Sequence, residues 1–230
     1  MKIAIMGAIP EEVAPILEKL GEYITTKYAD NEYYEASYKG VDIVVAYSKI
    51  GKVFSTLTAS TMIQHFNCDK LLFSGVAGGI NPSLKIGDLI VATKLAQHDL
   101  DITAFGHPFG FVPEGAVFVE ADASMIALSK EVASEMGKSV KEGIIATGDQ
   151  FVANAERKNW IGDTFKADAL EMEGASVAVV CNALDVPFFI LRAISDAADM
   201  DASFSFDEFL ETSAIESAEF VMKMVDKIVD

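Results

Sequence analysis

Strand-like and helix-like patterns alternate along almost the whole chain, and this alternation limits the fold more than any other feature. Short apolar runs predict buried strands at 2–7, 71–74, 88–93, 142–146, 167–172 and 187–194. Helices are predicted at 10–20, 51–66, 124–137, 154–165, 174–184 and 205–230, the last with a capping pair at Ser205 and Glu208. Residues 32–48 read as two more strands about the Lys39-Gly40 turn. We therefore predict an α/β class fold, a three-layer α/β/α arrangement around a mixed, mostly parallel central sheet.

Size and charge narrow the class of protein further. The chain of 230 residues, 51% of them hydrophobic, can bury the core of one domain, and no linker or repeat divides residues 1–230. A net charge of −17 argues against binding to nucleic acid or to an anionic membrane. No apolar run approaches the roughly 20 residues of a membrane span, and the first residues lack the apolar core of a signal peptide. With Cys68 and Cys181 in apolar segments as free thiols, we expect a cytoplasmic protein.

Unusual residues gather at the predicted carboxyl ends of the strands. Five segments stand there: 7–12, "SGVAGG" (74–79, taken as a glycine-rich turn), "TGDQFV" (147–152), "LEMEG" (170–174) and "RAISD" (192–196). In open α/β sheets, ligands bind outside the carboxyl ends of strands. The sequence therefore predicts one ligand site built from these five segments.

Each acidic residue in these segments allows two interpretations. Asp196 ends a buried strand, where a carboxylate is costly unless it is paired or protonated, so it either caps a helix or carries a proton. Glu12 lies in the first turn of a predicted helix, where it either stabilises the helix dipole or takes part in catalysis. Glu171 and Glu173 either cap a helix or accept hydrogen bonds from the vicinal hydroxyls of a ribose.

Other residues are candidates for binding the remaining parts of a ligand, such as a flat heterocycle, a phosphate or a metal. Phe151 either stacks on a heterocycle or packs in the core, and the backbone of Val152 could read the edge of a purine. "SGVAGG" lacks the lysine of a P-loop and the full dinucleotide glycine spacing. Arg157 and Arg192 are the only arginines, few for an enzyme that binds free phosphate. The three histidines and two cysteines have no metal-ligand spacing, so we predict neither a metal nor a cofactor.

Taken together, these segments resemble the bacterial 5′-methylthioadenosine/S-adenosylhomocysteine nucleosidases, of the nucleoside phosphorylase superfamily. The likeness covers essentially the whole chain, through "KIAIMGAIPEEV", "SKIGKV", "SGVAGGI", "LKIGDLIV", "TGDQFV", "LEMEGASVAVVC", "LRAISDAAD" and "SFDEFL". "FSGVAGG" and "QHDLDITAFGHPFGFVPE" are most similar to the branch that also cleaves 6-amino-6-deoxyfutalosine. The resemblance implies irreversible hydrolysis of the adenine N-glycosidic bond in methylthioadenosine, S-adenosylhomocysteine, 5′-deoxyadenosine and aminodeoxyfutalosine.

The resemblance also implies a role for each matching residue. Glu12 matches the base that activates water, Glu173 the carboxylate that binds ribose hydroxyls, and Asp196, held by Ser195, the acid that protonates N7 of adenine. The remaining residues expected to bind substrate are Gly78, Phe151, Val152, Met172, Glu171, Arg192, Val76, Ile9, Ile50 and Phe206.

A homodimer is implied as well, with Ile102 and Phe105 reaching the neighbouring subunit's pocket. Two positions depart from the family pattern. Val76 stands where many members have serine, so positioning of the water is expected to rest more on Glu12 and Arg192. Pro10 replaces an acidic residue before the Glu-Glu pair and is expected to leave Glu12 in place.

Three other hypotheses about the function of the protein remain at this point. A purine or uridine phosphorylase of the same superfamily would need a phosphate site, against which the shortage of arginine argues. A non-catalytic adenine-nucleoside sensor would be favoured by loss of Glu12, Glu173 or Asp196, yet all three are present. A flavodoxin-like or dinucleotide-binding domain is the third hypothesis.

Overall fold

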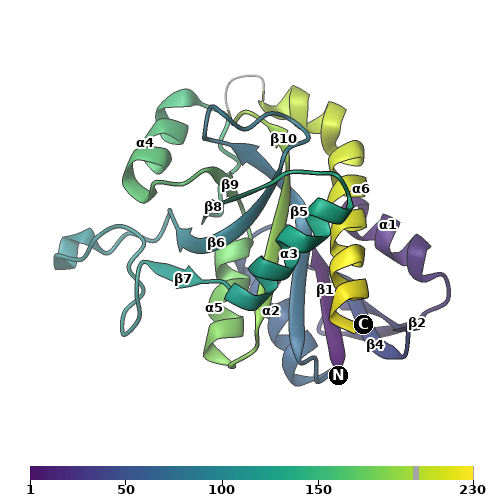
Figure 1. Cartoon of the computed structure of the whole chain (residues 1–230). Helices are drawn as coiled ribbons and strands as arrows, with labels where there is room; N and C mark the ends of the chain where they lie inside the picture. The colour runs from purple at the N-terminus through teal and green to yellow at the C-terminus, as the bar shows by residue number, and fades with distance from the viewer. Residues whose placement is uncertain (199–201, 230) are drawn as a thin grey trace.

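A computed structural model of the chain describes residues 1–198 and 202–229, with side chains from residue 206 onward in the second range (Figure 1). The strands are β1 (Lys2–Gly7), β2 (Ile24–Tyr28), β3 (Asn31–Tyr38), β4 (Val41–Tyr47), β5 (Lys70–Gly79), β6 (Leu89–Gln97), β7 (Phe118–Glu120), β8 (Val140–Thr147), β9 (Ala169–Glu171) and β10 (Phe188–Asp196). The helices are α1 (Pro10–Leu20), α2 (Lys52–Gln64), η1 (Thr103–Phe105), α3 (Ala123–Glu135), α4 (Ala155–Phe165), α5 (Gly174–Ala183) and α6 (Ala202–Val229). The predicted α/β fold class and the alternation of elements are confirmed.

The strands form one mixed sheet in the order β10-β6-β8-β9-β5-β1-β4-β3-β2, with β7 on β6 and a further pairing of β10 with β5. That further pairing closes a ring, because β5, β10, β6, β8 and β9 each pair with the next. The sheet thus rolls into a barrel at one end and stays open along β1, β4, β3 and β2. The ring brings the carboxyl ends of β5, β8, β9 and β10 together.

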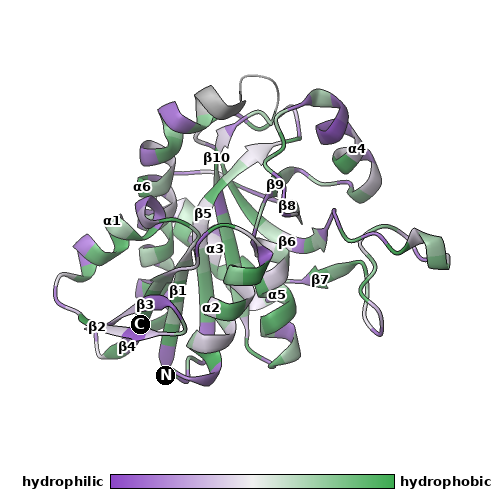
Figure 2. Cartoon of the chain, turned by 180° about the vertical axis from the view of Figure 1, so that it is seen from behind, coloured by the Kyte–Doolittle hydropathy of each residue, from purple (hydrophilic) through white to green (hydrophobic). Residues whose placement is uncertain are grey.

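Alternation of side chains along the strands divides the core between two faces of the sheet. In β1, Ile3 and Ile5 pack in one cluster with residues of α1, α3 and α6. Ala4 and Met6 point the other way, into a cluster with residues of α2 and α5. Figure 2 shows the strands between the helices as mainly hydrophobic. This is the predicted three-layer arrangement.

The prediction that "SGVAGG" is a turn is wrong. Strand β5 continues through these residues to Gly79, pairing with β10 as far as Gly78. A Cβ at Gly75 would lie 2.7 Å from Glu12 Oε1, and one at Gly78 would lie 2.9 Å from Asp196 Oδ1. The glycines therefore serve close approach of acidic side chains to a strand.

Other differences lie at the margins. Strands β2 and β7 were not predicted, and β2 is an edge strand with mostly exposed side chains. Helix α6 begins at Ala202, so Ser205 lies inside the helix and not at its N-cap; the Ser205 side chain and Asp230 lie outside the described residues. Cys68 and Cys181 are buried and not disulfide-bonded, as predicted. No helix within 1–198 and 202–229 is both long and apolar enough to cross a membrane.

Candidate active site

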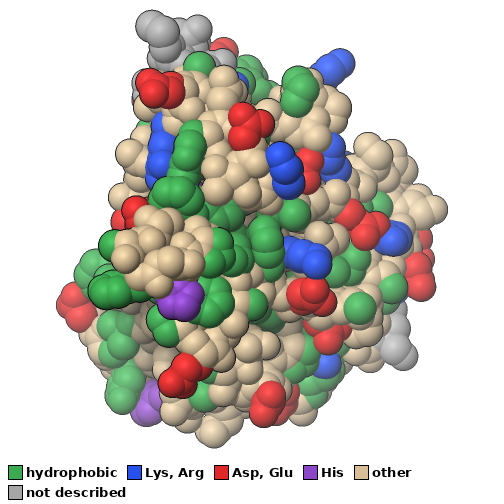
Figure 3. Space-filling model, turned by 90° about the vertical axis from the view of Figure 1, so that its left-hand side faces the viewer, with side chains coloured by type: hydrophobic (Ala, Val, Ile, Leu, Met, Phe, Trp, Pro, Cys, Tyr) green, Lys and Arg blue, Asp and Glu red, His purple; other side chains and the backbone are tan. Residues whose placement is uncertain are grey.

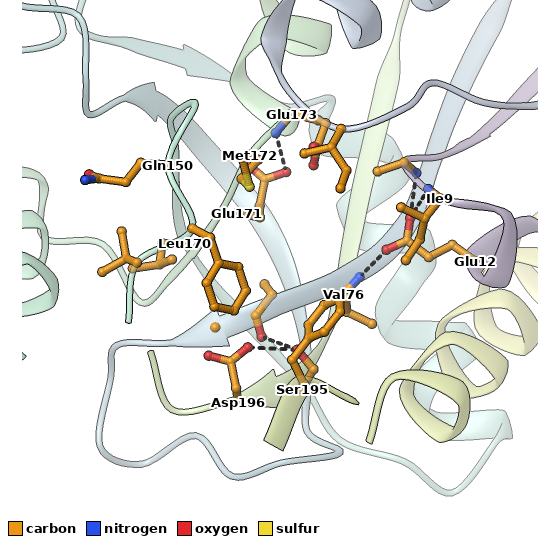
Figure 4. A pocket seen from close by; sticks show the side chains of 17 residues that line it. Ile9, Glu12, Val76, Gln150, Leu170, Glu171, Met172, Glu173, Ser195 and Asp196 are labelled. Carbon is orange, nitrogen blue, oxygen red and sulfur yellow. Dashed lines mark hydrogen bonds between the residues drawn. The ribbon is translucent and has the colours of Figure 1, made fainter. Parts of the chain in front are cut away.

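The five segments predicted to form a site converge on one cavity of about 280 Å³. All of the predicted site residues line it except Arg192, Ile102 and Phe105. Figure 4 shows Glu12, Glu173 and Asp196 approaching the cavity from three different sides. The lining residues are Ala8, Ile9, Glu12, Ile50, Val76, Ala77, Gly78, Gln150, Phe151, Val152, Leu170, Glu171, Met172, Glu173, Ser195, Asp196 and Phe206.

Glu12 is held in the first turn of α1 by backbone N–H groups on both sides. Its Oε2 accepts hydrogen bonds from Ala8 N at 2.5 Å and Ile9 N at 3.3 Å, and its Oε1 accepts one from Val76 N at 2.9 Å. On this edge of β5, pairing with β1 ends at Phe73 and pairing with β9 begins at Gly78. The N–H of Val76, which lies between them, can therefore donate to Glu12. Burial raises the pKa of Glu12 although Arg192 and these N–H groups oppose the shift. Glu12 therefore stabilises the start of α1 and also presents a buried carboxyl to the cavity.

Asp196 lies at the last position of β10, and 4% of its surface is exposed. Its Oδ2 accepts a hydrogen bond from Ser195 Oγ at 3.0 Å (Figure 4). Its Oδ1 accepts one from Ala198 N at 2.7 Å. Ser195 thus orients the carboxyl, as the resemblance implied. The bond to Ala198 is a local turn contact of the kind aspartate makes with the backbone two residues on.

Glu171 and Glu173 accept hydrogen bonds from different parts of the chain. Glu171 accepts bonds from Gly174 N at 2.7 Å and Glu173 N at 3.2 Å, at the start of α5, and from Thr147 Oγ1. Glu173 instead accepts a bond from Gly51 N at 2.8 Å, at the start of α2. Burial and the neighbouring Glu171 raise the pKa of Glu173 to about 8. Glu171 thus caps the start of α5, and both residues line the cavity.

Arg192 is buried behind the cavity wall. It donates to Glu171 Oε2 at 2.7 Å, and its guanidinium lies 4.0 Å from the centre of the Phe73 ring. This pairing with Glu171 compensates for the burial of both charges. Arg192 acts on the site through Glu171 and through its electrostatic influence on Glu12.

Aromatic and apolar side chains make up the open end of the cavity. The rings of Phe151 and Phe206 meet edge to face with their centres 5.9 Å apart, and Ile50 and Phe151 remain 58% and 47% exposed. Val152 is buried and Met172 half-buried. Ile102 and Phe105 lie elsewhere, at η1, and Phe105 is 80% exposed. Figures 1 and 2 show the segment around η1 projecting from the body of the molecule.

Comparison with known proteins assigns the family. A family model described as the phosphorylase superfamily matches residues 2–229. The aminodeoxyfutalosine nucleosidase of Campylobacter jejuni is 57% identical over 228 residues, which are 99% of this chain and 100% of that protein. The 5′-methylthioadenosine/S-adenosylhomocysteine nucleosidase of an Exiguobacterium species is 38% identical over 230 residues, 99% of each chain. The chain belongs to the phosphorylase superfamily.

A solved structure within the superfamily agrees with this assignment. The 5′-methylthioadenosine/S-adenosylhomocysteine nucleosidase from Helicobacter pylori with butyl-thio-DADMe-Immucillin-A is 53% identical, with a TM-score of 0.98 over 99% of this chain and 98% of that one. The predicted family and fold class are confirmed. As a member of the superfamily whose relatives are nucleosidases, the protein is an enzyme, an N-glycosyl hydrolase.

Four cavity residues of this superfamily member were not predicted from the sequence: Ala8, Ala77, Gln150 and Leu170. Three of them are apolar residues of kinds that fill any core. Their position in "GAIPEE", "SGVAGG" and "LEMEG" was the available signal, since each adjoins a predicted site residue. Gln150 directly precedes Phe151, and that adjacency was its only signal.

Proposed function

We propose that this enzyme hydrolyses the N-glycosidic bond of adenine nucleosides with a modified 5′ carbon, releasing adenine and the free ribose derivative. The substrates are methylthioadenosine, S-adenosylhomocysteine, 5′-deoxyadenosine and 6-amino-6-deoxyfutalosine. The names of the Campylobacter and Exiguobacterium relatives support three of these substrates, namely aminodeoxyfutalosine, methylthioadenosine and S-adenosylhomocysteine. Methionine salvage and menaquinone synthesis are the pathways that use such reactions.

The observation that carries the proposal is that Glu12, Glu173 and Asp196, three of the four buried acidic residues that line the cavity, meet there; the fourth, Glu171, pairs with Arg192. Gly75 and Gly78 of β5 abut Glu12 and Asp196, and three residues of strand span roughly 10 Å. Glycosidases that activate water also hold an acid and a base on opposite sides of the reacting bond. The proposal requires that a water molecule, the anomeric carbon and the imidazole ring of adenine fit between these two carboxyls.

Glu12 acts as the general base that takes a proton from the attacking water. Its carboxyl is fixed by three backbone N–H groups, and its raised pKa brings it closer to the operating range of a base at neutral pH. Residue 76 contributes through its backbone N–H, so the valine side chain does not weaken the hold on Glu12. Arg192 tunes the charge of Glu12 from behind the wall.

Asp196 acts as the general acid at N7 of adenine. Adenine leaves poorly as an anion, and a proton on N7 makes the leaving group neutral. Ser195 holds the Asp196 carboxyl in position, and Gly78 allows the close approach of that carboxyl to β5. Phe151 stacks on the base, and the backbone of Val152 reads its edge.

Glu173 binds the ribose hydroxyls, with Met172 beside it. Its Oε1 is fixed by the Gly51 N–H, which leaves the second oxygen for the sugar. Ile9, Ile50 and Phe206 form the apolar wall around the 5′ substituent. An apolar wall suits a thioether or a deoxy carbon better than a phosphate.

The active form is a homodimer in which Ile102 and Phe105 complete the neighbour's 5′ pocket. Exposed apolar side chains beside the cavity support this arrangement, since large apolar patches mark association surfaces. Ile50, Val53, Phe54 and Leu57, at or near the start of α2, are all more than 40% exposed. Figure 3 shows hydrophobic side chains gathered on one face of the molecule.

We place the enzyme in the cytoplasm, in keeping with its two free thiols.

Adenine release from the four substrates, with and without inorganic phosphate, tests the proposal. We expect release from each substrate, free ribose derivatives as the products, and no effect of phosphate on rate or product. A sugar 1-phosphate among the products would assign the enzyme to the phosphorylases instead. No adenine release from any of the four would favour a nucleoside sensor.

A further inference from the structure

A closed cluster of three charged residues lies just outside the cavity, and the hydrolysis described above does not account for it. Lys52 begins α2, Asp99 follows β6, and Asp149 follows β8. Lys52 Nζ donates to Asp99 Oδ1 at 2.6 Å, Asp149 N donates to Asp99 Oδ2 at 2.8 Å, and Lys52 N donates to Asp149 Oδ1 at 2.7 Å. Each member thus bonds to the other two.

Helix α2 needs this cluster at its start. Gly51, its N-cap, has no side chain to accept a hydrogen bond, and the first turn holds no acidic residue. Helices whose first N–H groups lack a cap are less stable, because buried donors are left without an acceptor. Asp149, 97 residues away in sequence, supplies the missing acceptor. The cap of α2 is therefore also a tie between two distant loops.

The cluster adjoins the two cavity walls that hold the sugar and the base. Immediately before Lys52, Ile50 lines the cavity and Gly51 N holds the Glu173 carboxyl. Immediately after Asp149, residues 150–152 line the cavity and include Phe151. Lys52, Asp99 and Asp149 do not line it themselves. Their effect on substrate must pass through these neighbours.

The pair formed by Lys52 and Asp99 is better shielded than an ordinary surface ion pair. Their side chains are 19% and 24% exposed. Burial opposes ionisation of Asp99, but the Lys52 ammonium and the Asp149 N–H outweigh it and hold the pKa of Asp99 below its ordinary value. The cluster therefore stays charged and intact at neutral pH.

We propose that Lys52 and Asp99 are positioning residues that fix the Gly51 N–H against Glu173 and so set the enzyme's selectivity for ribose hydroxyls. The inference rests on the proposed role of Glu173. When the Lys52–Asp99 pair is broken, the bond from the Lys52 N–H to Asp149 is the tie that remains between the start of α2 and the Gly148–Phe151 loop, and the Gly51 N–H is held less firmly against Glu173. The transition state is then deprived of one well-placed hydrogen bond to Glu173, and a loss of this kind is worth about a tenfold change in rate.

The test compares kcat/KM for methylthioadenosine and for its 2′-deoxy analogue. The variants are Asp99→Asn, Lys52→Met and the double variant, with Lys52→Arg as the conservative change. We expect the ratio of the two kcat/KM values to fall about tenfold in each single variant. In the double variant this ratio should fall no further than in the single variants, because the effects of substituting two residues that act as one unit are not additive. Lys52→Arg should restore most of the ratio.

Two controls separate the possible causes. Lys130→Met breaks an exposed ion pair with Glu142 far from the cavity and should keep the wild-type ratio. Glu173→Ala, which removes both hydrogen-bonding oxygens, should abolish the preference for the ribose; if it does not, the role of Glu173 itself fails. If Glu173→Ala abolishes the preference while Asp99→Asn and Lys52→Met keep it, the positioning role is overturned. Equal losses on both substrates would overturn it too, because they would mark a purely structural contribution.

Discussion

The stability of the Glu173→Gln variant relative to wild type should increase as the pH rises. Burial and Glu171 raise the pKa of Glu173 to about 8, against an ordinary value of 4.5. The folded protein therefore holds a proton on Glu173 that the unfolded chain releases. That stabilisation is fully present below pH 4.5 and is lost as the pH rises through about 8.

The interval from 4.5 to 8 spans about 3.5 pH units. At about 1.4 kcal/mol for each unit, wild type loses on the order of 5 kcal/mol of Glu173-linked stability across it. Glutamine has no proton to lose at this position. The stability of Glu173→Gln minus that of wild type should therefore rise by about 2–5 kcal/mol between about pH 5 and pH 9.

Urea unfolding of both proteins at several pH values and one fixed protein concentration measures this difference. Glu120→Gln, which removes an exposed carboxyl paired with Lys94, is the matched control and should track wild type at every pH. Parallel stability curves for wild type and Glu173→Gln would refute the reasoning, because Glu173 would then have a similar pKa in the folded and unfolded states.

Three further perturbations address other parts of the site. Glu12→Gln should lower kcat by about 10²–10⁴-fold with inhibitor binding kept, and a kcat near wild type would leave Glu12 only as a stabiliser of α1. Phe105→Ala should raise KM for substrates with large 5′ groups, and sedimentation should find a dimer; a fully active monomer would contradict both. Gly75→Ala adds a Cβ 2.7 Å from Glu12 Oε1 and should lower kcat at least about tenfold, whereas Gly115→Ala, with its nearest neighbour at 3.4 Å, should match wild type.

The elements that could be predicted are those in which the hydrophobic residues form a continuous run or recur at helical spacing. The apolar runs that became β1 and β10 and the helix that became α4, with Asn154 at its N-cap, match the structure within a few residues. The edge strand β2, "ITTKY", was missed because four of its five residues are exposed, so no apolar alternation marks it. Strand β5 was cut short at its glycines, whose purpose lies in contacts with Glu12 and Asp196 that no local pattern reveals.

The sequence predicted which residues line the cavity better than it predicted how they are arranged there. Resemblance supplied the residues, and their convergence followed from the ends of the strands. The different hydrogen-bond partners of Glu171 and Glu173, Arg192 for one and Gly51 for the other, are 21 and 122 residues away in sequence, so no local pattern reveals them. The cluster of Lys52, Asp99 and Asp149 joins three segments that are separated in sequence, so only the fold brings it into view.

The most direct test of the account is the dependence of Asp196→Asn on the leaving group. Asparagine keeps the acceptor for the Ala198 N–H but has no proton to transfer, so the variant should fold with near wild-type stability. The measurement is kcat of wild type and variant on methylthioadenosine and on an analogue whose base departs without protonation at N7. We predict a loss of about 10²–10⁴-fold on methylthioadenosine and recovery of most of the rate on the activated analogue. Equal losses on both substrates, or full activity on methylthioadenosine, would contradict the role of Asp196 as the acid.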